Sequence, residues 1–385
     1  MTRVLIAIAI LASLNFYVAF QIINRWPWAG RHVLAAGFVV LLFFALQLSA
    51  PFGDRLLFPA LRKKYAIDGL WVATNWASYL ALGILSCLFL YMVATDIVAL
   101  VWKLVSPPSR AVDFDRRALL TLGIATLGTT ALGVRQAMAG PVVRVVEIAL
   151  ANLPAAFDGF KIAQISDLHA GPLIGRRYVE NVVGKVNDLQ PDLIALTGDF
   201  VDGTVDDLRA DLAPLAALNA PCGTFYVTGN HEYYWGASAW IDEFTRLGAR
   251  VLNNEHQVIR RDGAEIVVAG VTDYSTRHLD PAEATSPERA VAGAPAGLVK
   301  ILLAHQPASY QMAHAAGFDL QMSGHTHAGQ YFPFSLLVGL FQRYYKGLNR
   351  HGTMWIYVNG GTGYWGPPLR TGIPSEITLI KLKSV

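Results

Sequence analysis

The sequence predicts an α/β protein, an α+β sandwich of two packed mixed β-sheets flanked by helices, preceded by an N-terminal region of four transmembrane helices. Three observations lead to this prediction. Of the 385 residues, 53% are hydrophobic and 15% are charged, whereas about 25% are charged in an average soluble protein. The long apolar runs all lie before residue 140. Beyond it, strand patterns first alternate with helical patterns and then follow one another directly.

Residues 1–140 are predicted to form a multi-pass transmembrane anchor, with spans at about 4–23, 32–50, 72–100 and 118–139. A helix needs about 20 apolar residues to cross a bilayer, and these runs reach that length. The first run could instead be a signal peptide, but it is longer than the apolar part of such a peptide. Asp96 lies late in the third run. An ionisable residue there is a functional candidate, yet we favour a helix end or a pair within the bundle.

The two parts of the chain differ in charge. Residues 1–147 hold 13 Lys and Arg against 6 Asp and Glu (+7), and residues 148–385 hold 18 against 22 (−4), which together give the net +3. We assign the basic surplus to loops beside a membrane, so it does not indicate nucleic-acid binding. Nine of the ten histidines lie in the second part. Two distant cysteines, Cys87 and Cys222, exclude a disulfide framework and a cysteine metal site.

The orientation in the membrane is not decided by the basic loops, because their charges divide almost evenly between the two sides. Arg116-Arg117, the apolar run that follows and Ala137-Met138-Ala139 look like a twin-arginine export signal. Such a signal would place the second part outside the cytoplasm. The alternative is an ordinary helix flanked by basic residues, and we favour the extracytoplasmic side.

Residues 141–385 are predicted to form the second domain. An alternating pattern predicts a strand over 142–150, and a short apolar run predicts a buried strand over 160–166. Helical patterns cover 176–189, 206–218 and 238–247. Further strands are expected at 192–197, 224–228, 250–253, 257–260, 266–271, 300–304, 318–322, 354–358 and 376–382.

Polar side chains follow five of these strands directly. They form the groups Asp167-x-His169, Gly198-Asp199-x-x-Asp202, Gly229-Asn230-His231-Glu232, His305 and Gly324-His325-x-His327. Loops at one edge of a sheet can bring such residues to a single point. The glycines before Asp199, Asn230 and His325 allow sharp turns and a close backbone approach.

The chemistry of these side chains indicates a metal site. Carboxylate, amide and imidazole ligands without thiolate suit manganese, iron or zinc. The potential ligands are too many for one tetrahedral ion, but they fit two divalent ions that share a carboxylate. Two such ions can clamp a phosphoryl group and supply a hydroxide nucleophile.

The ordered set of five motifs resembles the calcineurin-like metallophosphoesterases, over about residues 145–385. The groups Leu303-Ala304-His305-Gln306-Pro307 and Gly363-Tyr364-Trp365-Gly366-Pro367 are similar to the membrane-associated bacterial phosphodiesterase branch. The resemblance implies an integral protein of the bacterial inner (cell) membrane, with a hydroxide that bridges two metals and attacks phosphorus.

The resemblance also implies a role for each motif residue. Asp167, His169, Asp199 and His327 would bind the first metal, and Asp199, Asn230, His305 and His325 the second. His231 would be the catalytic residue that faces the phosphate. Asp202 and Glu232 would orient ligands; a turn aspartate and a surface glutamate are the plainer alternatives.

One departure from the family bears on the substrate. Many protein phosphatases of this family place an arginine after the Gly-Asp-x-x-Asp turn to hold a phosphate dianion, and here Gly203 follows it. We therefore expect a phosphodiester or pyrophosphate substrate that is lipid-linked or comes from the cell envelope. Arg370 and Arg176 are candidate substrate contacts, with a plain surface arginine as the alternative. The rival functions are a phosphomonoesterase and a non-catalytic membrane sensor or binding module.

The expected partners are the lipid bilayer and the phosphorylated substrate. The segment Phe332–Tyr345 is apolar, is followed by Lys346 and comes directly after the last metal motif. It could lie on the bilayer surface and feed the site with lipid, or it could be a buried helix or hairpin, and the sequence does not decide between them.

Overall fold

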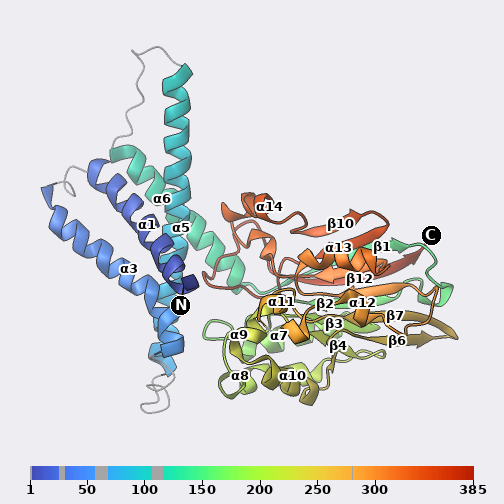
Figure 1. Ribbon diagram of the computed structural model, residues 1–385. Helices are drawn as coiled ribbons and strands as arrows, with labels where there is room; N and C mark the ends of the chain where they lie inside the picture. Colours follow the sequence, from blue (N-terminus) through green and yellow to red (C-terminus); the bar gives the residue numbers. More distant parts are fainter. Residues whose placement is uncertain (1, 26–30, 57–67, 106–115, 280) are drawn as a thin grey trace. The chain divides into compact units, whose positions relative to one another are not determined.

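The computed structural model describes residues 2–25, 31–56, 68–105, 116–279 and 281–385 (Figure 1). The chain divides into two compact units. One consists of Met1–Arg135 together with Gly366–Thr371, and the other of Gln136–Trp365 together with Gly372–Val385.

The first unit is built on four long helices: α1 (Thr2–Arg25), α3 (Val33–Leu56), α5 (Asp68–Val105) and α6 (Arg116–Met138). All four are long and apolar enough to cross a membrane, as the apolar runs predicted. Polar side chains pair between these helices. The amide of Asn15 donates to Gln47 over 2.8 Å, and Asp96 accepts from Tyr17 and forms an ion pair with Arg25. Asp96 therefore pairs within the bundle, which is the interpretation that its sequence position favoured.

The short segment Gly366–Thr371 belongs to the helical unit, although the predicted boundary placed it in the second domain. The backbone N–H of Arg370 donates to the carbonyl of Gly133, and the hydroxyl of Thr371 donates to that of Thr129. A Cβ atom at Gly83 would lie 2.7 Å from the side chain of Leu369. Nothing in the sequence indicated this packing, because it depends on small residues far away in the chain.

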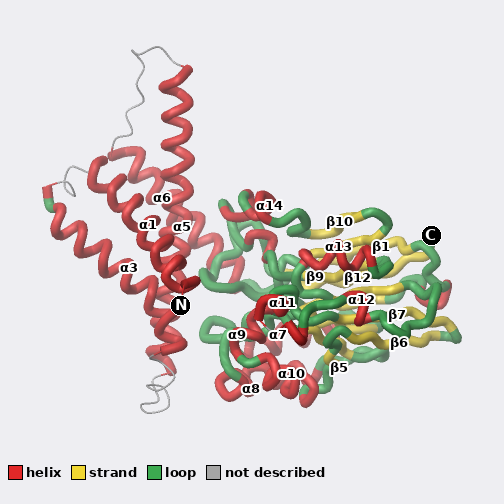
Figure 2. The backbone as a smooth tube through the Cα atoms, viewed as in Figure 1, coloured by secondary structure: helices red, strands yellow, loops and turns green. Residues whose placement is uncertain are grey.

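The second unit is a sandwich of two six-stranded mixed sheets (Figures 1 and 2). The first sheet has the order β1-β12-β2-β3-β4-β5 and the second β10-β11-β9-β8-β7-β6. In the first sheet the strands are β1 (Val142–Leu150), β12 (Glu376–Ser384), β2 (Lys161–Ile165), β3 (Leu193–Thr197), β4 (Thr224–Val227) and β5 (Arg250–Val251). In the second they are β10 (Gly347–His351), β11 (Met354–Val358), β9 (Leu320–Ser323), β8 (Lys300–Leu303), β7 (Ala264–Gly270) and β6 (Glu255–Arg261).

The core of this unit lies between the sheets and under the outer helices. Ile162, Leu193 and Phe225 of the first sheet share one buried cluster with Ile301 and Leu320 of the second. The helices of this unit are α7 (Arg176–Asp188), α8 (Val205–Leu212), α9 (Asn230–Trp235), α10 (Ala237–Arg246), α11 (Thr276–Leu279), α12 (Pro287–Ala290), α13 (Tyr310–Ala315) and α14 (Val338–Phe341).

Helix α7 shows why the local patterns were readable. Its valines at 179, 182, 183 and 186 are all buried, and their spacing of three and four residues lines one helical face. The predicted α/β sandwich is present, with strands and helices near the expected ranges. The sequence did not predict the strand β10, whose residues Gly347–His351 lack an alternating pattern, or the helix α9, which begins inside the motif at Asn230. It also did not predict the short helices α11, α12, α13 and α14.

Candidate metal centre

The potential ligands come together because of the strand order. In the first sheet, Asp167 follows β2, Asp199 follows β3 and Asn230 follows β4. These three strands are parallel neighbours. His305 and His325 follow β8 and β9, which are parallel neighbours in the other sheet. Parallel strands end at the same edge of a sheet, so the side chains that follow them meet there.

The backbone of these turns is unusual in a way that marks a functional site. Five of the seven predicted ligands have a positive φ: Asp167, His169, Asp199, His325 and His327, with values of 49–69°. A positive φ is uncommon for residues with a Cβ atom and is maintained only where the surrounding structure fixes it. The structure therefore holds these ligands in a conformation that an ordinary turn would avoid.

The glycines of the motifs allow neighbouring turns to approach one another closely, as the sequence suggested. A Cβ atom at Gly229 would lie 2.2 Å from a carboxylate oxygen of Asp199. One at Gly324 would lie 2.0 Å from the hydroxyl of Ser166 and 2.1 Å from Asp167. Neither position has room for any side chain, so both turns need glycine.

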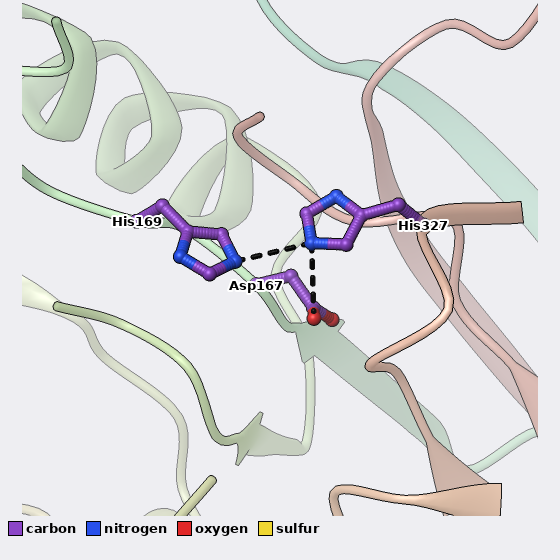
Figure 3. A group of neighbouring side chains, drawn as sticks. All are labelled: Asp167, His169 and His327. Atoms are coloured by element: carbon purple, nitrogen blue, oxygen red, sulfur yellow. Dashed lines mark hydrogen bonds and ion pairs between the residues drawn. The ribbon is translucent and has the colours of Figure 1, made fainter. Parts of the chain in front are cut away.

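The first group of ligands consists of Asp167, His169 and His327, all buried (Figure 3). The Nε2 atoms of His169 and His327 lie 3.0 Å apart, and His327 Nε2 lies 3.4 Å from a carboxylate oxygen of Asp167. The two rings point toward one another with the carboxylate beside them (Figure 3). Asp167 also accepts the backbone N–H of His325, at 2.9 Å, which joins this group to the second one.

The second group consists of Asp199, His305 and His325. His305 Nε2 lies 3.0 Å from Asp199 and 3.2 Å from His325 Nδ1. The other ring nitrogen of His305 lies 2.8 Å from the carbonyl of Thr197. Because that carbonyl can only accept, Nδ1 carries the hydrogen, and Nε2 is the ring atom that faces Asp199 and His325.

The donor set fits divalent metal ions. In both groups, imidazole nitrogens lie at about hydrogen-bond distance from one another and from carboxylate oxygens. A cation bound between these atoms would offset the repulsion of their lone pairs. The side-chain oxygen of Asn230 is buried and has no hydrogen-bond partner among the described residues. A buried acceptor of this kind suits a ligand that binds through oxygen.

Two carboxylates hold the ligands in place. Glu232 is fully buried and accepts three backbone N–H groups, from Gly229 at 2.6 Å, Phe200 at 2.8 Å and Asp199 at 3.0 Å. It therefore ties the turn after β4 to the turn after β3. Asp202 lies 2.5 Å from Nδ1 of His231 and 3.2 Å from Nδ1 of His169. It therefore holds the ring of His231 by a hydrogen bond and lies at ion-pair distance from that of His169.

His231 is buried next to both groups; it is not a predicted ligand, but it forms a third group of possible metal-binding side chains with His169 and Asp202. Its backbone N–H donates to Asp199 over 2.8 Å, and its Nε2 lies 3.9 Å from the same carboxylate. Burial alone would lower its pKa, but the charges of Asp199 and Asp202 outweigh burial and raise the pKa to about 9. The ring can therefore carry a positive charge at neutral pH and donate a hydrogen bond or a proton.

The carboxylates and imidazoles shift one another's pKa. Burial would raise the pKa of Asp199, but the charges of His305 and His231 hold it well below its usual range. Burial and the charge of His305 lower the pKa of His325 to about 3, so His325 is neutral and able to bind a metal at physiological pH. Burial raises the pKa of Asp167.

The two arginines of the prediction lie in different surroundings. Arg176 is exposed at the start of α7, where its guanidinium contacts Glu180 and the carbonyl of Ala210. Arg370 is fully buried and belongs to the helical unit. Their role as substrate contacts stays a prediction.

Sequence reasoning missed two aromatic residues beside the site. The rings of Tyr234 and Trp365 lie 5.2 Å and 5.7 Å from that of His231, and both side chains are about half exposed, 48% and 52%. Gln330 fixes Trp365, since its amide both donates to the carbonyl and accepts the N–H of that residue, each over 2.9 Å. Trp365 was visible only as part of the motif near the C-terminus, and no pattern marked Tyr234.

Asp273 was also missed, although a signal for it existed. It is buried after β7, where it accepts from Gln306 beside His305. Burial raises its pKa. Like the predicted ligands, it follows a strand directly, and that position could have pointed to it.

Comparison with known proteins gives the same family as the geometry. Residues 160–329 match the model of the calcineurin-like phosphoesterase family. An uncharacterized metallophosphoesterase of Helicobacter pylori is 38% identical over 277 residues, which cover 71% of this chain and 73% of that protein. The chain belongs to the calcineurin-like phosphoesterase family. Proteins of this family use divalent metals.

Two vertebrate relatives are similar as well. Proteins of Danio rerio and Bos taurus, both named transmembrane protein with metallophosphoesterase domain, are 37% and 36% identical over 277 and 288 residues. These matches cover 70% and 71% of this chain. They span less than two thirds of the relatives' own length, 63% and 65%.

Proposed function

We propose that this protein is a membrane-anchored phosphoesterase that uses two divalent ions to hydrolyse a phosphodiester or pyrophosphate bond of a lipid-linked or cell-envelope substrate. The observation that carries the proposal is the convergence of two groups of Asp and His side chains on His231. The four apolar helices of the same chain support an anchor in the membrane.

The metals would be held by the residues of the two groups. Asp167, His169 and His327 offer one set of donors, and Asp199, His305 and His325 the other, with the buried oxygen of Asn230 available to the second. Bound divalent ions supply Lewis acidity toward the phosphate oxygens and an activated water as nucleophile.

The protein itself contributes orientation and a proton donor. Asp202 accepts from Nδ1 of His231, which leaves Nε2 of that ring for the substrate. From there Nε2–H can donate to a phosphoryl oxygen or protonate the leaving oxygen. Tyr234 and Trp365 border the same ring, so their exposed faces are suited to contact an apolar leaving group.

The preference for a diester follows from the charge near the phosphate. The residue after the Asp199–Asp202 turn is Gly203, whose carbonyl accepts from the indole of Trp240 over 3.2 Å. This position therefore supplies no guanidinium. A phosphate monoester carries up to two negative charges and a diester only one, so a site with less positive charge favours the diester.

The test is hydrolysis by the purified full chain with Mn²⁺. Bis-p-nitrophenyl phosphate and p-nitrophenyl phosphate are compared side by side, with Asp199→Asn as the inactive control and Glu180→Gln as a matched surface control. We expect diester cleavage that Asp199→Asn abolishes and Glu180→Gln leaves unchanged. Cleavage of the monoester alone would refute the diester preference. No turnover with Mn²⁺, Fe²⁺ or Zn²⁺, together with bound metal, would favour the non-catalytic binding module.

A further inference from the structure

The segment from Tyr331 to Tyr345, here called the 331–345 loop, exposes large apolar side chains. Phe332, Leu336, Leu340 and Phe341 are 39%, 69%, 76% and 83% exposed. Leu340 and Phe341 lie in α14, and Leu336 ends the preceding 3₁₀ turn. A solvent-facing cluster of this kind marks a binding surface more often than a packing defect. The structure thus disfavours the buried helix or hairpin that the sequence left open.

The loop is fastened at both ends to the turn that carries two of the histidines. The N–H of Tyr331 donates to the carbonyl of Gly329 over 2.7 Å. The hydroxyl of Thr326, between His325 and His327, donates to the carbonyl of Tyr345 over 2.6 Å. A Cβ atom at Gly329 would lie 2.6 Å from Cα of Ser335, so loop and turn are in direct contact. Whatever binds the loop is therefore held next to the metal centre.

The rings of the 331–345 loop pack within the loop itself. Tyr331 is buried and its ring lies 5.3 Å from that of Phe334. Gly339 lies against the ring of Tyr345, where an added Cβ would be 3.0 Å away. These contacts are made between residues of the loop, and the side chains of Leu336, Leu340 and Phe341 stay exposed.

Positive charge follows the apolar tip. Arg343, Lys346 and Arg350 are exposed. Arg343 lies over the ring of Tyr344 at 5.5 Å, and Lys346 over that of Tyr345 at 5.4 Å. An apolar tip with a cationic and aromatic border is the pattern of a segment that enters the boundary of an anionic membrane, because the apolar groups bury among acyl chains and the cations meet lipid phosphates.

We propose that the 331–345 loop docks on an anionic lipid bilayer and so brings the metal centre to phosphate groups at the membrane surface. A bilayer is favoured over a protein partner because the same chain carries four helices able to cross a membrane, and tethering raises the effective concentration of the lipid surface. This inference deepens the proposed function and rests on the membrane anchor in it.

The test measures the position of the loop without using catalysis. A single cysteine replaces Leu340 in the full chain with Cys222→Ser, while the fully buried Cys87 stays in place. The cysteine is labelled with the dye NBD, and the protein is reconstituted in nanodiscs of phosphatidylcholine with phosphatidylglycerol. Val385→Cys is the matched control, since Val385 is an exposed apolar residue at the C-terminus, at the far end of the sandwich from α14 (Figure 1). The protein with Cys222→Ser alone, which retains only Cys87, is the control for background labelling.

We expect the dye at position 340 to be blue-shifted and to be quenched at least twofold more than at 385 by lipids with a nitroxide on the acyl chain. Replacing phosphatidylglycerol by neutral lipid, or introducing Arg343→Glu with Lys346→Glu, should reduce this quenching. Equal quenching at 340 and 385 would overturn the proposal. A blue shift without lipid quenching would overturn it too and would indicate a protein partner.

A second measurement uses activity. The variant Leu336→Ser, Leu340→Ser, Phe341→Ser should lose about tenfold or more in hydrolysis of a vesicle-embedded phosphodiester, because the loss of even one apolar side chain from the lipid weakens binding by about a factor of ten. Hydrolysis of the soluble bis-p-nitrophenyl phosphate should stay within twofold of the parent. Equal loss on both substrates would contradict the docking role. Failure of the proposed chemistry would be recognised separately, as an inactive parent protein whose position 340 is still quenched by lipid.

Discussion

The carboxylate of Glu232 offers the sharpest test of how the metal-binding turns are held. It is fully buried and accepts the backbone N–H groups of Gly229, Asp199 and Phe200. The variant Glu232→Ala leaves all three donors without an acceptor. Each buried group left unsatisfied costs about 1–3 kcal/mol, so the variant should lose at least about 3 kcal/mol of unfolding free energy.

The variant Glu232→Gln separates hydrogen bonding from side-chain volume. The amide keeps one acceptor oxygen, but its NH₂ group must face at least one of the three N–H donors. We expect an intermediate loss of about 1–3 kcal/mol. Since burial and the charge of Asp199 raise the pKa of Glu232, the carboxylate is costly to keep ionised, and the three N–H bonds are what compensate for this.

The assay is thermal unfolding of the detergent-solubilised full chain, followed by intrinsic fluorescence. For a domain of 150–250 residues, 1 kcal/mol corresponds to about 2–4 °C in Tm, so Glu232→Ala should lower Tm by about 6 °C or more. Glu180→Gln removes an exposed carboxylate that pairs with Arg176 one turn away and should change Tm by about 2 °C at most. Equal Tm values for Glu232→Ala and Glu180→Gln would refute the reasoning.

Three further predictions concern the site. Asp202→Asn replaces the carboxylate that holds Nδ1 of His231. In steady-state assays kcat should fall by about 10²-fold or more with little change in KM. An unchanged kcat would show that the carboxylate does not position the ring. In the metal-free protein, burial lowers the pKa of His305 but the charge of Asp199 outweighs it and holds the pKa well above its usual value, so His305 retains a proton more strongly than a free imidazole does. Mn²⁺ must then displace a proton, so its affinity should rise with pH. Titration calorimetry in two buffers of different ionisation enthalpy should reveal the proton release. Identical heats of binding in both buffers would contradict this. Trp365→Ala should raise KM for aryl diesters several-fold, since an aromatic contact contributes about 0.5–1.5 kcal/mol. Trp365→Phe should retain most of the affinity. Equal KM values for the two variants would argue against a ring contact.

Much of the fold was predictable because its signals are local. The apolar runs that become α1, α3, α5 and α6 are set by composition over about 20 residues. The strands of the sandwich show short apolar runs followed by Gly, Asp, Asn or His, and Asp167, Asp199 and His325 among these positions have a positive φ. The glycines before Asp199 and His325 could be interpreted in the same way, because a turn that approaches another backbone closely excludes a side chain.

Other features could not be predicted because they depend on segments far apart in the chain. His169 and His327 are 158 positions apart and become neighbours only through the order and the parallel pairing of the strands. Tyr234 and Trp365 reach His231 in the same way. The packing of Gly366–Thr371 with α5 and α6 is another example, since its contacts are made with glycines that look like ordinary helix residues.

The sequence by itself determined the family, the α/β sandwich, the four apolar helices and the set of candidate ligands, because each rests on residue types at short spacing. The tertiary structure alone decided that Glu232 ties two turns together, that Asp202 lies next to two imidazoles, and that the 331–345 loop exposes Leu336 and Leu340. The physical reason is that the sequence around an apolar residue is the same whether the residue faces a core or a membrane. The sequence around a carboxylate likewise does not show whether the carboxylate is buried or exposed. Which side each one faces depends on the strands and turns that pack around it.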